Sequence, residues 1–235
     1  NNDQSARILE LRSGNADSVY VEPNYREEVL TYDGMQYEGN LPSLSMGFIG
    51  FNHNISNYED TAPSRDFFTS EDIRKGFCYS FDYDSYIENI LDGWGKQPTG
   101  PIPEGLLGYD ENGPQYNYDP SMAEQHFRDA GVWDTGFTIT AYYNLGNDVR
   151  LNALLLLENA LEEMNSKFNV EVQGLEWPTY LDKLRANELP LFFLGWAPDY
   201  ADPHNYAHPF LHGEGHFAHY LGFQYDDIER LFYYA

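Results

Sequence analysis

At residues 189–203 the chain reads Leu189-Pro190-Leu191-Phe192-Phe193-Leu194-Gly195-Trp196-Ala197-Pro198-Asp199-Tyr200-Ala201-Asp202-Pro203. The first six residues form an apolar run that is typical of a buried strand. The turn that follows is stiffened by two prolines and carries a large aromatic ring and carboxylates. In open α/β sheets, ligands bind outside the carboxyl ends of strands. The stretch therefore predicts a strand end that recognises a small polar ligand, with a cationic ligand among the candidates.

Regular elements lie immediately upstream of this stretch. Residues 137–143 alternate as a strand does, and apolar positions between 149 and 164 form a helical stripe. A strand at 168–172, a short helix at 178–186 and the strand at 189–195 complete a β-α-β-α-β series. Such a series favours a parallel sheet with right-handed crossovers. The fold class predicted is α/β.

The first half of the chain has weaker signals. Gly14 is a suitable left-handed cap for a helix at 3–13, and Asp119-Pro120 reads as an N-cap followed by proline in the first helical turn. The same reasoning predicts the further elements, which are strands at 18–21 and 44–52 and helices at 69–81, 84–93 and 119–130.

Composition limits the classes of function. The 235 residues include 38 acidic and 13 basic side chains, which give a formal charge of −25. Nucleic acid is excluded as a partner, because phosphate binding needs lysine and arginine. A solvated acidic surface explains the charge more simply than capture of ligands by acidic groups. The single Cys78 excludes an internal disulfide, no apolar run is long enough to cross a membrane, and both ends are expected to continue into a longer protein.

Charged and aromatic residues follow each of the three predicted parallel strands. If the sheet is parallel, the loops after these strands share one edge, which brings together Arg150, Trp177, Trp196 and Asp199. A zwitterion such as a peptide needs an anion for its amine and a cation for its carboxylate. Tryptophan faces supply apolar contact area. The alternative at this point is structural: both tryptophans anchor the core and Asp199 caps a turn.

Five histidines lie close together near the end of the chain. Spacings of four residues among them would align metal ligands on one helix face, but Pro209, Gly213 and Gly215 are expected to interrupt that helix. We therefore expect no native metal site there. The histidines are His204, His208, His212, His216 and His219.

Signatures of catalysis are absent from the sequence. There is no Gly-x-Ser-x-Gly elbow, no phosphate-binding loop and no His-Glu-x-x-His. A glycosidase needs two carboxylates at a defined separation, and no motif here marks such a pair. We expect no catalytic residue and no cofactor.

Several segments, taken in order, resemble the extracellular solute-binding proteins of peptide ABC transporters, the oligopeptide, dipeptide and nickel class. The main one is the stretch from Gly195 to Pro203. The dense aromatic and acidic composition is similar to that of members from heat-loving archaea. The other segments that carry the resemblance are Leu11-Arg12-Ser13-Gly14-Asn15-Ala16-Asp17, Ser80-Phe81-Asp82-Tyr83-Asp84, Gly100-Pro101-Ile102-Pro103, Tyr118-Asp119-Pro120, Asp129-Ala130-Gly131 and Leu175-Glu176-Trp177-Pro178-Thr179-Tyr180-Leu181.

The resemblance implies a periplasmic-binding-protein-like fold of type II, in which two lobes close over a ligand. By that analogy, residues 1–51 are a remnant of the first lobe with a crossover strand at 44–52. Residues 52–235 are the second, ligand-binding lobe, truncated at its end, with a mixed, largely parallel sheet flanked by helices. Half of the ligand cleft, and the anchor that would attach the protein to a membrane, then lie outside this chain.

The resemblance also implies roles for individual residues. Asp199 resembles the residue that pairs with the amino terminus of the ligand, and Trp177 and Trp196 resemble walls of side-chain pockets. The backbone from Gly195 through Ala197 resembles a stretch that pairs with a bound peptide. Arg150 lies near the position where relatives have a cation for the peptide carboxylate.

The function implied is extracellular capture of oligopeptides, followed by delivery to the permease subunits of an ABC transporter at the cell surface. Arg150 is the one obvious cation at the predicted strand ends. Relatives that bind β-linked oligosaccharides contact the sugar through tryptophan stacking and carboxylates. A sugar is therefore an alternative ligand. A nickel-type metal receptor and a glycoside hydrolase are the remaining alternatives.

Overall fold

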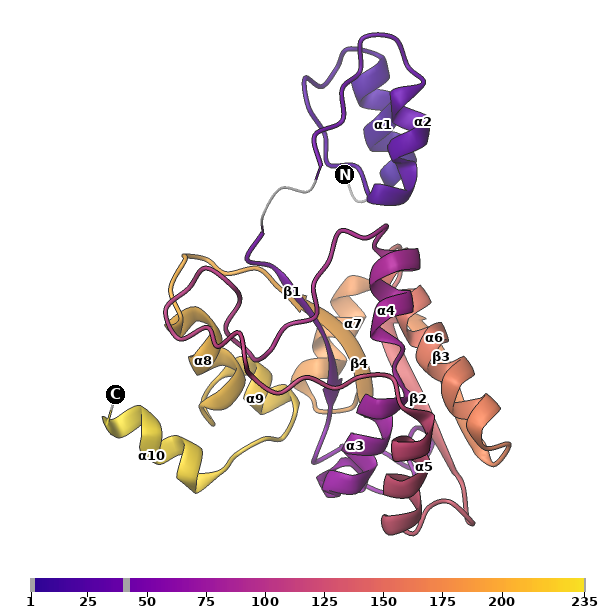
Figure 1. Cartoon of the computed structure of the whole chain (residues 1–235), viewed down its shortest axis with the longest axis vertical. Helices are drawn as coiled ribbons and strands as arrows, with labels where there is room; N and C mark the ends of the chain where they lie inside the picture. Colours follow the sequence, from indigo (N-terminus) through magenta and orange to yellow (C-terminus); the bar gives the residue numbers. More distant parts are fainter. Residues whose placement is uncertain (1–2, 40–42, 235) are drawn as a thin grey trace. The chain divides into compact units, whose positions relative to one another are not determined.

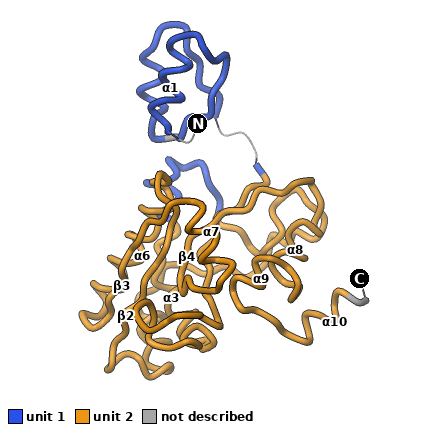
Figure 2. The backbone as a smooth tube through the Cα atoms, turned by 180° about the vertical axis from the view of Figure 1, so that it is seen from behind, with its two compact units in different colours: residues 1–43, 84–96 blue, residues 44–83, 97–235 orange. Residues whose placement is uncertain are grey.

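The computed structural model describes residues 3–39 and 43–234. The chain divides into two compact units, shown in Figure 2. Unit 1 comprises residues 1–43 and 84–96, and unit 2 comprises residues 44–83 and 97–235. The assignment of residues 1–51 and 52–235 to two lobes of a binding protein stays a prediction.

Unit 1 is helical in its first segment. Helix α1 spans Gln4–Arg12 and begins at Asp3, whose carboxylate accepts the Ala6 N–H at 2.7 Å. A 3-10 turn (Pro23–Tyr25) leads into α2, which spans Arg26–Leu30. The strand predicted at 18–21 is wrong. That segment has no strand partner in the described part of the chain, and the carbonyl of Tyr20 instead accepts a hydrogen bond from Nε of Arg7 at 3.0 Å.

The second segment of unit 1 contributes an aromatic contact. Helix α4 (Tyr83–Ser85) continues into a π-helical turn (Tyr86–Ile90) in place of the helix predicted at 84–93. The Trp94 ring lies 5.5 Å from that of Tyr37 and so close to Gly39 that a Cβ there would come within 1.6 Å of it. Glycine at position 39 is therefore required by the packing of Trp94.

Unit 2 is built on a four-stranded sheet in the order β1-β4-β2-β3. The strands are β1 (Met46–Phe51), β2 (Phe137–Asn144), β3 (Phe168–Leu175) and β4 (Leu191–Trp196). Strand β2 is parallel to β3 and β4, whereas β1 is antiparallel to β4. The mixed, largely parallel sheet predicted from the sequence is confirmed, and Figure 1 shows helices flanking it.

The helices predicted at 69–81, 119–130, 149–164 and 178–186 are present in unit 2 with small changes in their bounds, and three further helices follow β4 in the described residues. Two of the predicted helices connect the parallel strands, since α6 joins β2 to β3 and α7 joins β3 to β4. The helices are α3 (Glu71–Ser80), α5 (Pro120–Asp129), α6 (Asp148–Met164), α7 (Trp177–Arg185), α8 (His204–Leu211), α9 (His216–Tyr220) and α10 (Asp226–Tyr234).

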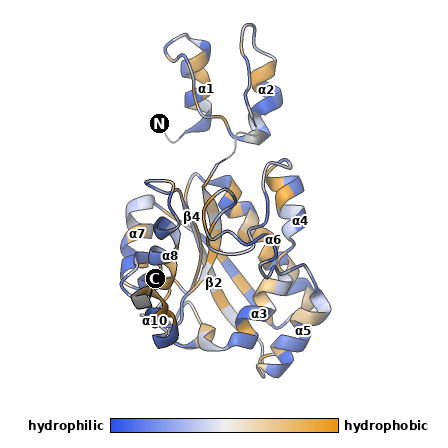
Figure 3. Ribbon diagram, turned by 60° about the vertical axis from the view of Figure 1, so that its left-hand side comes forward, coloured by the Kyte–Doolittle hydropathy of each residue, from blue (hydrophilic) through white to orange (hydrophobic). Residues whose placement is uncertain are grey.

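Alternate residues of the strands enter two cores, because successive side chains of a strand point to opposite faces. Figure 3 shows hydrophobic residues along β2. On one face, Phe137 packs 5.6 Å from Phe77 of α3. On the other face, Phe192 and Tyr142 join a cluster with residues of α7 and α9. Gly50 of β1 leaves room for the Phe192 ring, which a Cβ would approach to 2.4 Å.

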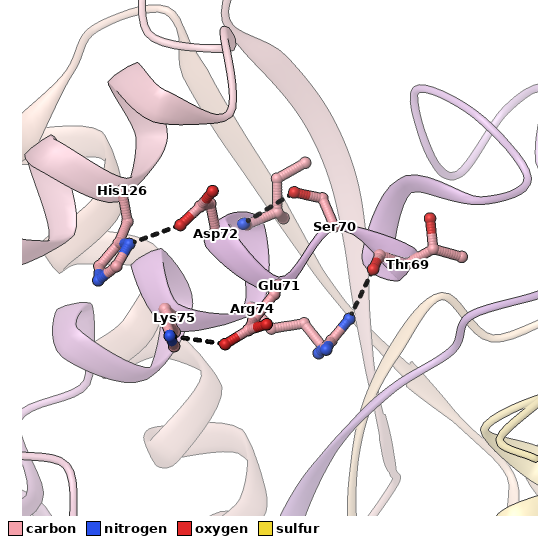
Figure 4. A network of polar contacts seen from close by, with 8 residues as sticks. Thr69, Ser70, Glu71, Asp72, Arg74, Lys75 and His126 are labelled. Atoms are coloured by element: carbon pink, nitrogen blue, oxygen red, sulfur yellow. Dashed lines mark hydrogen bonds and ion pairs between the residues drawn. The ribbon is translucent and has the colours of Figure 1, made fainter. Parts of the chain in front are cut away.

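The start of α3 is fixed by polar contacts with α5, shown in Figure 4. The hydroxyl of Ser70 accepts the Ile73 N–H at 3.4 Å, as expected of an N-cap. Asp72, in the first turn, lies 2.9 Å from Nδ1 of His126 in α5. The Asp72–His126 contact joins α3 to α5, and α3 covers the face of the sheet opposite to the cluster with α7 and α9.

Candidate functional site

The carboxyl ends of the three parallel strands lie at one edge of the sheet. Asn144 at the end of β2 is opposite Leu175 at the end of β3, and β4 runs parallel to β2 and ends at Trp196. Strand β1 enters at the same edge, where Met46 is opposite Trp196. We call this edge, with the loops that leave it, the strand-end site.

Arg150 reaches across the strand-end site from the first turn of α6. Its backbone N–H is capped by Oδ1 of Asn147 at 3.0 Å, and its Nη1 donates to Oδ1 of Asn144 at 2.7 Å. Its Nη2 lies 3.1 Å from the position that a Cβ on Gly195 would occupy. Glycine at position 195 therefore lets the guanidinium approach the end of β4.

Trp177 lies at the start of α7 and presents an open face. Its ring stacks on Tyr180 with centroids 5.8 Å apart and planes 17° apart, and the residue is 43% exposed. Tyr180 is fully buried, and its hydroxyl donates to the carbonyl of Phe193 at 2.8 Å. Burial raises the pKa of Tyr180, and the positive charge of Arg150 opposes that rise.

Trp196 is held by both packing and a hydrogen bond. Its ring is edge-on to Phe217 of α9 at 5.3 Å and packs on the core cluster that contains Phe192. Its indole Nε1 donates to the backbone carbonyl of Asn205 at 2.7 Å. The expectation that Trp196 is a core anchor and the expectation that it is a pocket wall are therefore compatible, since the ring is only partly buried.

Asp199 has a fixed backbone and an exposed side chain. Its N–H donates to Oδ1 of Asn205 at 2.9 Å, while the residue itself is exposed to solvent. Its negative charge raises the pKa of His216, against the larger lowering that burial causes. Ala197, between Trp196 and Asp199, is also exposed.

Asp202 forms the turn before α8. Its Oδ1 accepts the His204 N–H at 2.8 Å, and its carbonyl accepts the Asn205 N–H at 3.0 Å. The two carboxylates of the opening stretch therefore differ in role. Asp202 is engaged by the backbone, and Asp199 presents its carboxylate to solvent.

Asn205 is the residue of the strand-end site that sequence reasoning missed. It is 7% exposed and bonds to Trp196 through its carbonyl and to Asp199 through its side chain. A weak signal was present, because Pro209 lies four residues after it and has no N–H to complete a helical bond to the Asn205 carbonyl. The helix is interrupted between Leu211 and His216, where Gly213 and Gly215 lie, as expected; the interruption expected at Pro209 is wrong, since α8 continues through it.

The contacts in the structure divide most of the predicted ligand-binding residues into two groups. Gly195 and Arg150 approach each other closely, and Trp196 and Asp199 are joined by Asn205, whereas Trp177 stacks on Tyr180. The two groups meet in the chain at Gly195 and Trp196. The site offers the Arg150 guanidinium, aromatic surface and the exposed Asp199 carboxylate, with Glu176 and Asp202 also exposed in the same loops.

Two histidines of α8 and its C-cap residue His212 form a stacked row. The rings of His204 and His208 are 5.1 Å apart, and those of His208 and His212 are 4.6 Å apart. Nε2 of His212 lies 3.3 Å from Glu229 of α10, and burial, with its histidine neighbours, lowers the pKa of His208. In the described residues, no group of three or more His, Cys, Asp or Glu is arranged to hold a metal ion.

Residues 1–217 match the family described as bacterial extracellular solute-binding proteins, family 5 Middle. The chain belongs to this family. Its members are extracellular solute-binding proteins and not enzymes, and the resemblance found from the sequence is confirmed. Within residues 3–39 and 43–234, no helix combines the length and apolarity needed to span a bilayer.

Two curated proteins illustrate the similarity to other members of family 5. The chain is 27% identical over 203 residues to a probable D,D-dipeptide-binding periplasmic protein of Escherichia coli K12, an alignment that covers 86% of this chain and 36% of the relative. It is 25% identical over 217 residues to heme-binding protein A of Haemophilus influenzae, with coverage of 89% and 37%. The chain thus spans about a third of the length of these relatives.

A solved structure supports the fold. The structure of Listeria monocytogenes OppA bound to peptide superposes with a TM-score of 0.79 at 17% identity, covering 99% of this chain and 45% of that one. The chain therefore has the fold of part of a type II periplasmic binding protein.

Proposed function

We propose that the protein captures oligopeptides outside the cell and delivers them to the permease of an ABC transporter, and that the strand-end site is one wall of its binding cleft. Membership of family 5 and the peptide-binding relatives support this proposal. The observation that carries it is the presence, at one sheet edge, of the exposed Asp199 carboxylate, the Arg150 guanidinium and the open face of Trp177.

The chemistry of a peptide matches these three features. Asp199 accepts the amino terminus as an ion pair, and Arg150 faces a carboxylate or carbonyl of the peptide. Trp177 and Trp196 contact apolar side chains. Closure of the two lobes removes water from the ion pair between Asp199 and the peptide amine. Loss of the Asp199 charge should therefore weaken binding by about 2–4 kcal/mol.

The backbone of β4 supports pairing with an extended peptide. In the described residues its ladder with β2 covers Leu191 and Phe192, while its ladder with β1 continues as far as Trp196. Beyond Phe192 on the β2 side, the Tyr180 hydroxyl bonds to the Phe193 carbonyl. The segment from Gly195 through Ala197 can then add main-chain bonds to a ligand, as in other cases of strand addition.

Closure of the lobes over the ligand follows from a difference in ligand affinity between the closed and the open state. A ligand that contacts both lobes binds the closed state more tightly than the open one and shifts the population toward it. The expected signature is a decrease in radius of gyration on adding peptide, measured by small-angle scattering of the intact protein. Permease delivery and attachment at the cell surface belong to the same proposal.

Titration calorimetry of the intact protein tests the ligand class. A mixed peptide library should release heat with saturation, whereas cello- and manno-oligosaccharides should not. A parallel titration with haem tests the ligand named for the Haemophilus relative. Saturable binding of a sugar or of haem, with no response to peptides, would overturn the proposal.

A further inference from the structure

Helix α8 contains a proline in its last turn. Pro209 has no N–H, so the helical bond to the carbonyl of Asn205, four residues before it, cannot form. Asn205 is 7% exposed, and a buried carbonyl needs a partner. The sequence of α8 thus removes the usual helical donor of a carbonyl on a buried residue.

A side chain from the end of β4 satisfies this acceptor. Nε1 of Trp196 donates to the Asn205 carbonyl at 2.7 Å, and the Asp199 N–H donates to Oδ1 of Asn205 at 2.9 Å. One residue of α8 therefore fixes both an aromatic ring and the backbone that carries an exposed carboxylate. We call this pair of bonds the Asn205 clamp.

We propose that Asn205 and Pro209 are positioning residues for ligand binding. Pro209 keeps the Asn205 carbonyl available for Trp196, and the Asn205 side chain sets the place from which the Asp199 carboxylate projects. This inference rests on the proposed function, in which Trp196 and Asp199 contact the ligand.

The arrangement favours binding because it fixes the site before a ligand arrives. Ordering a loop on binding reduces affinity, and a loop that is already ordered avoids that loss. The Trp196 ring is also confined by Phe217 at 5.3 Å, so the indole bond selects one orientation of a ring that packing has already restricted. Asp199 keeps an exposed carboxylate on a fixed backbone.

The substitution Pro209→Ala tests the proline half of the clamp. The new N–H can bond to the Asn205 carbonyl and compete with the Trp196 indole, while alanine favours the helix. Hydrogen exchange of the Trp196 indole, followed by NMR and assigned through Trp196→Phe, should accelerate. Peptide affinity should fall about fivefold, the value of one ordinary hydrogen bond, without loss of thermal stability.

Pro120→Ala is the matched control for this substitution. Pro120 is exposed and lies in the first turn of α5, where its missing N–H has no helical acceptor. This variant should leave both the indole exchange and the peptide affinity at their wild-type values.

Asn205→Ala tests the side-chain half. It retains the backbone carbonyl that Trp196 uses and removes the acceptor for the Asp199 N–H. Exchange of the Asp199 amide should accelerate while that of the Trp196 indole stays as in wild type, and peptide affinity should again fall about fivefold.

A crossed pattern supports the clamp: Pro209→Ala changes the indole, Asn205→Ala changes the Asp199 amide, and both weaken peptide binding. Unchanged indole exchange in Pro209→Ala would overturn it. Faster exchange with unchanged peptide affinity would overturn the positioning role. If the wild-type protein binds no peptide, the proposed function fails and the positioning role fails with it, whereas the NMR measurements still decide the two bonds.

Discussion

Trp177 follows β3 and Trp196 ends β4, two strands with β2 between them, and the two rings are held in different ways. Trp196 packs on Phe217 and is tied to α8 by its indole N–H. Trp177 stacks on Tyr180 and leaves 43% of its surface exposed. The strand-end site thus combines a ring that belongs to the frame of the protein with a ring that presents a face to solvent. Substitutions at the first should affect stability most, and substitutions at the second should affect binding most.

Trp196→Ala should have the largest effect on stability. It removes ring packing from the core cluster and leaves the Asn205 carbonyl without its indole partner. We expect the free energy of unfolding to fall by about 3 kcal/mol, near the lower end for a large aromatic because the ring is only partly buried. Urea denaturation of the intact protein measures it. The comparison fails if Trp196→Ala is no more damaging than Trp177→Ala.

Arg150→Gln should have the next largest effect, on binding. A lost charge-assisted bond to a peptide carboxylate corresponds to about 2 kcal/mol of binding free energy. The matched variant Gly195→Ala places a Cβ 3.1 Å from Nη2 of Arg150 and should displace the guanidinium without removing it. Calorimetry with a peptide and its C-terminal amide checks this. A loss of the same size for both ligands would argue against a carboxylate partner.

Trp177→Ala should weaken peptide binding while lowering the stability of the protein only slightly. The ring is exposed on one face, and its stacking on Tyr180 contributes about 1 kcal/mol to the unfolding free energy. Affinity for peptides with apolar side chains should fall by more than affinity for glycine-rich ones. Trp177→Phe, which retains a smaller ring, is the control. If Trp177→Ala and the wild type bind every peptide with equal affinity, Trp177 does not contact the ligand.

His53 offers the smallest effect and a control at the opposite edge of the sheet, where β1 ends. Burial, with a smaller contribution from Arg74, lowers the pKa of His53 to about 4, against about 6.5 in an unfolded chain. Protons therefore bind the unfolded state preferentially, and stability should decline as pH falls from about 6.5 to about 4. His53→Gln should flatten that decline and leave peptide affinity at neutral pH unchanged.

Denaturation midpoints measured from pH 7 to pH 4 compare the two proteins. His208 and His216 have pKa values lowered by burial as well, so the wild-type decline contains their contributions and the difference between wild type and variant isolates His53. Identical pH dependence in the two proteins would contradict the burial of His53.

The periodic part of the fold was predictable from the sequence. Residues 137–143 and the helical stripe at 149–164 correspond to β2 and α6, because apolar residues at strand and helix periods mark the segments that are buried. Asp119 and Pro120 likewise mark the start of α5. Parallel pairing followed from the order of these elements.

The failures have physical reasons. Residues 18–21 have strand-like composition, but a strand also needs a partner, and composition does not supply one. Pro209 was expected to break a helix, yet the lost bond is compensated by Trp196, which lies in a different element. Trp196 and Pro209 lie in different elements, so no periodic pattern in the sequence predicts that one compensates for the other. Asn205 was missed for the same reason.

For the site, the sequence indicated which residues share the sheet edge but not how they are held. Arg150 and Gly195 come together because glycine leaves space for the guanidinium. Their proximity depends on the pairing of β4 and on the first turn of α6. The roles of these residues toward a ligand stay predictions.

Pairing of Asp199 with the amino terminus of a peptide is the central claim, and one set of titrations tests it. The intact protein and its Asp199→Asn variant are each titrated with one peptide in free and N-acetylated form. Acetylation should weaken binding strongly in the wild-type protein and little in the variant, which has already lost the partner of the amine. Equal losses on acetylation in the two proteins would contradict the pairing.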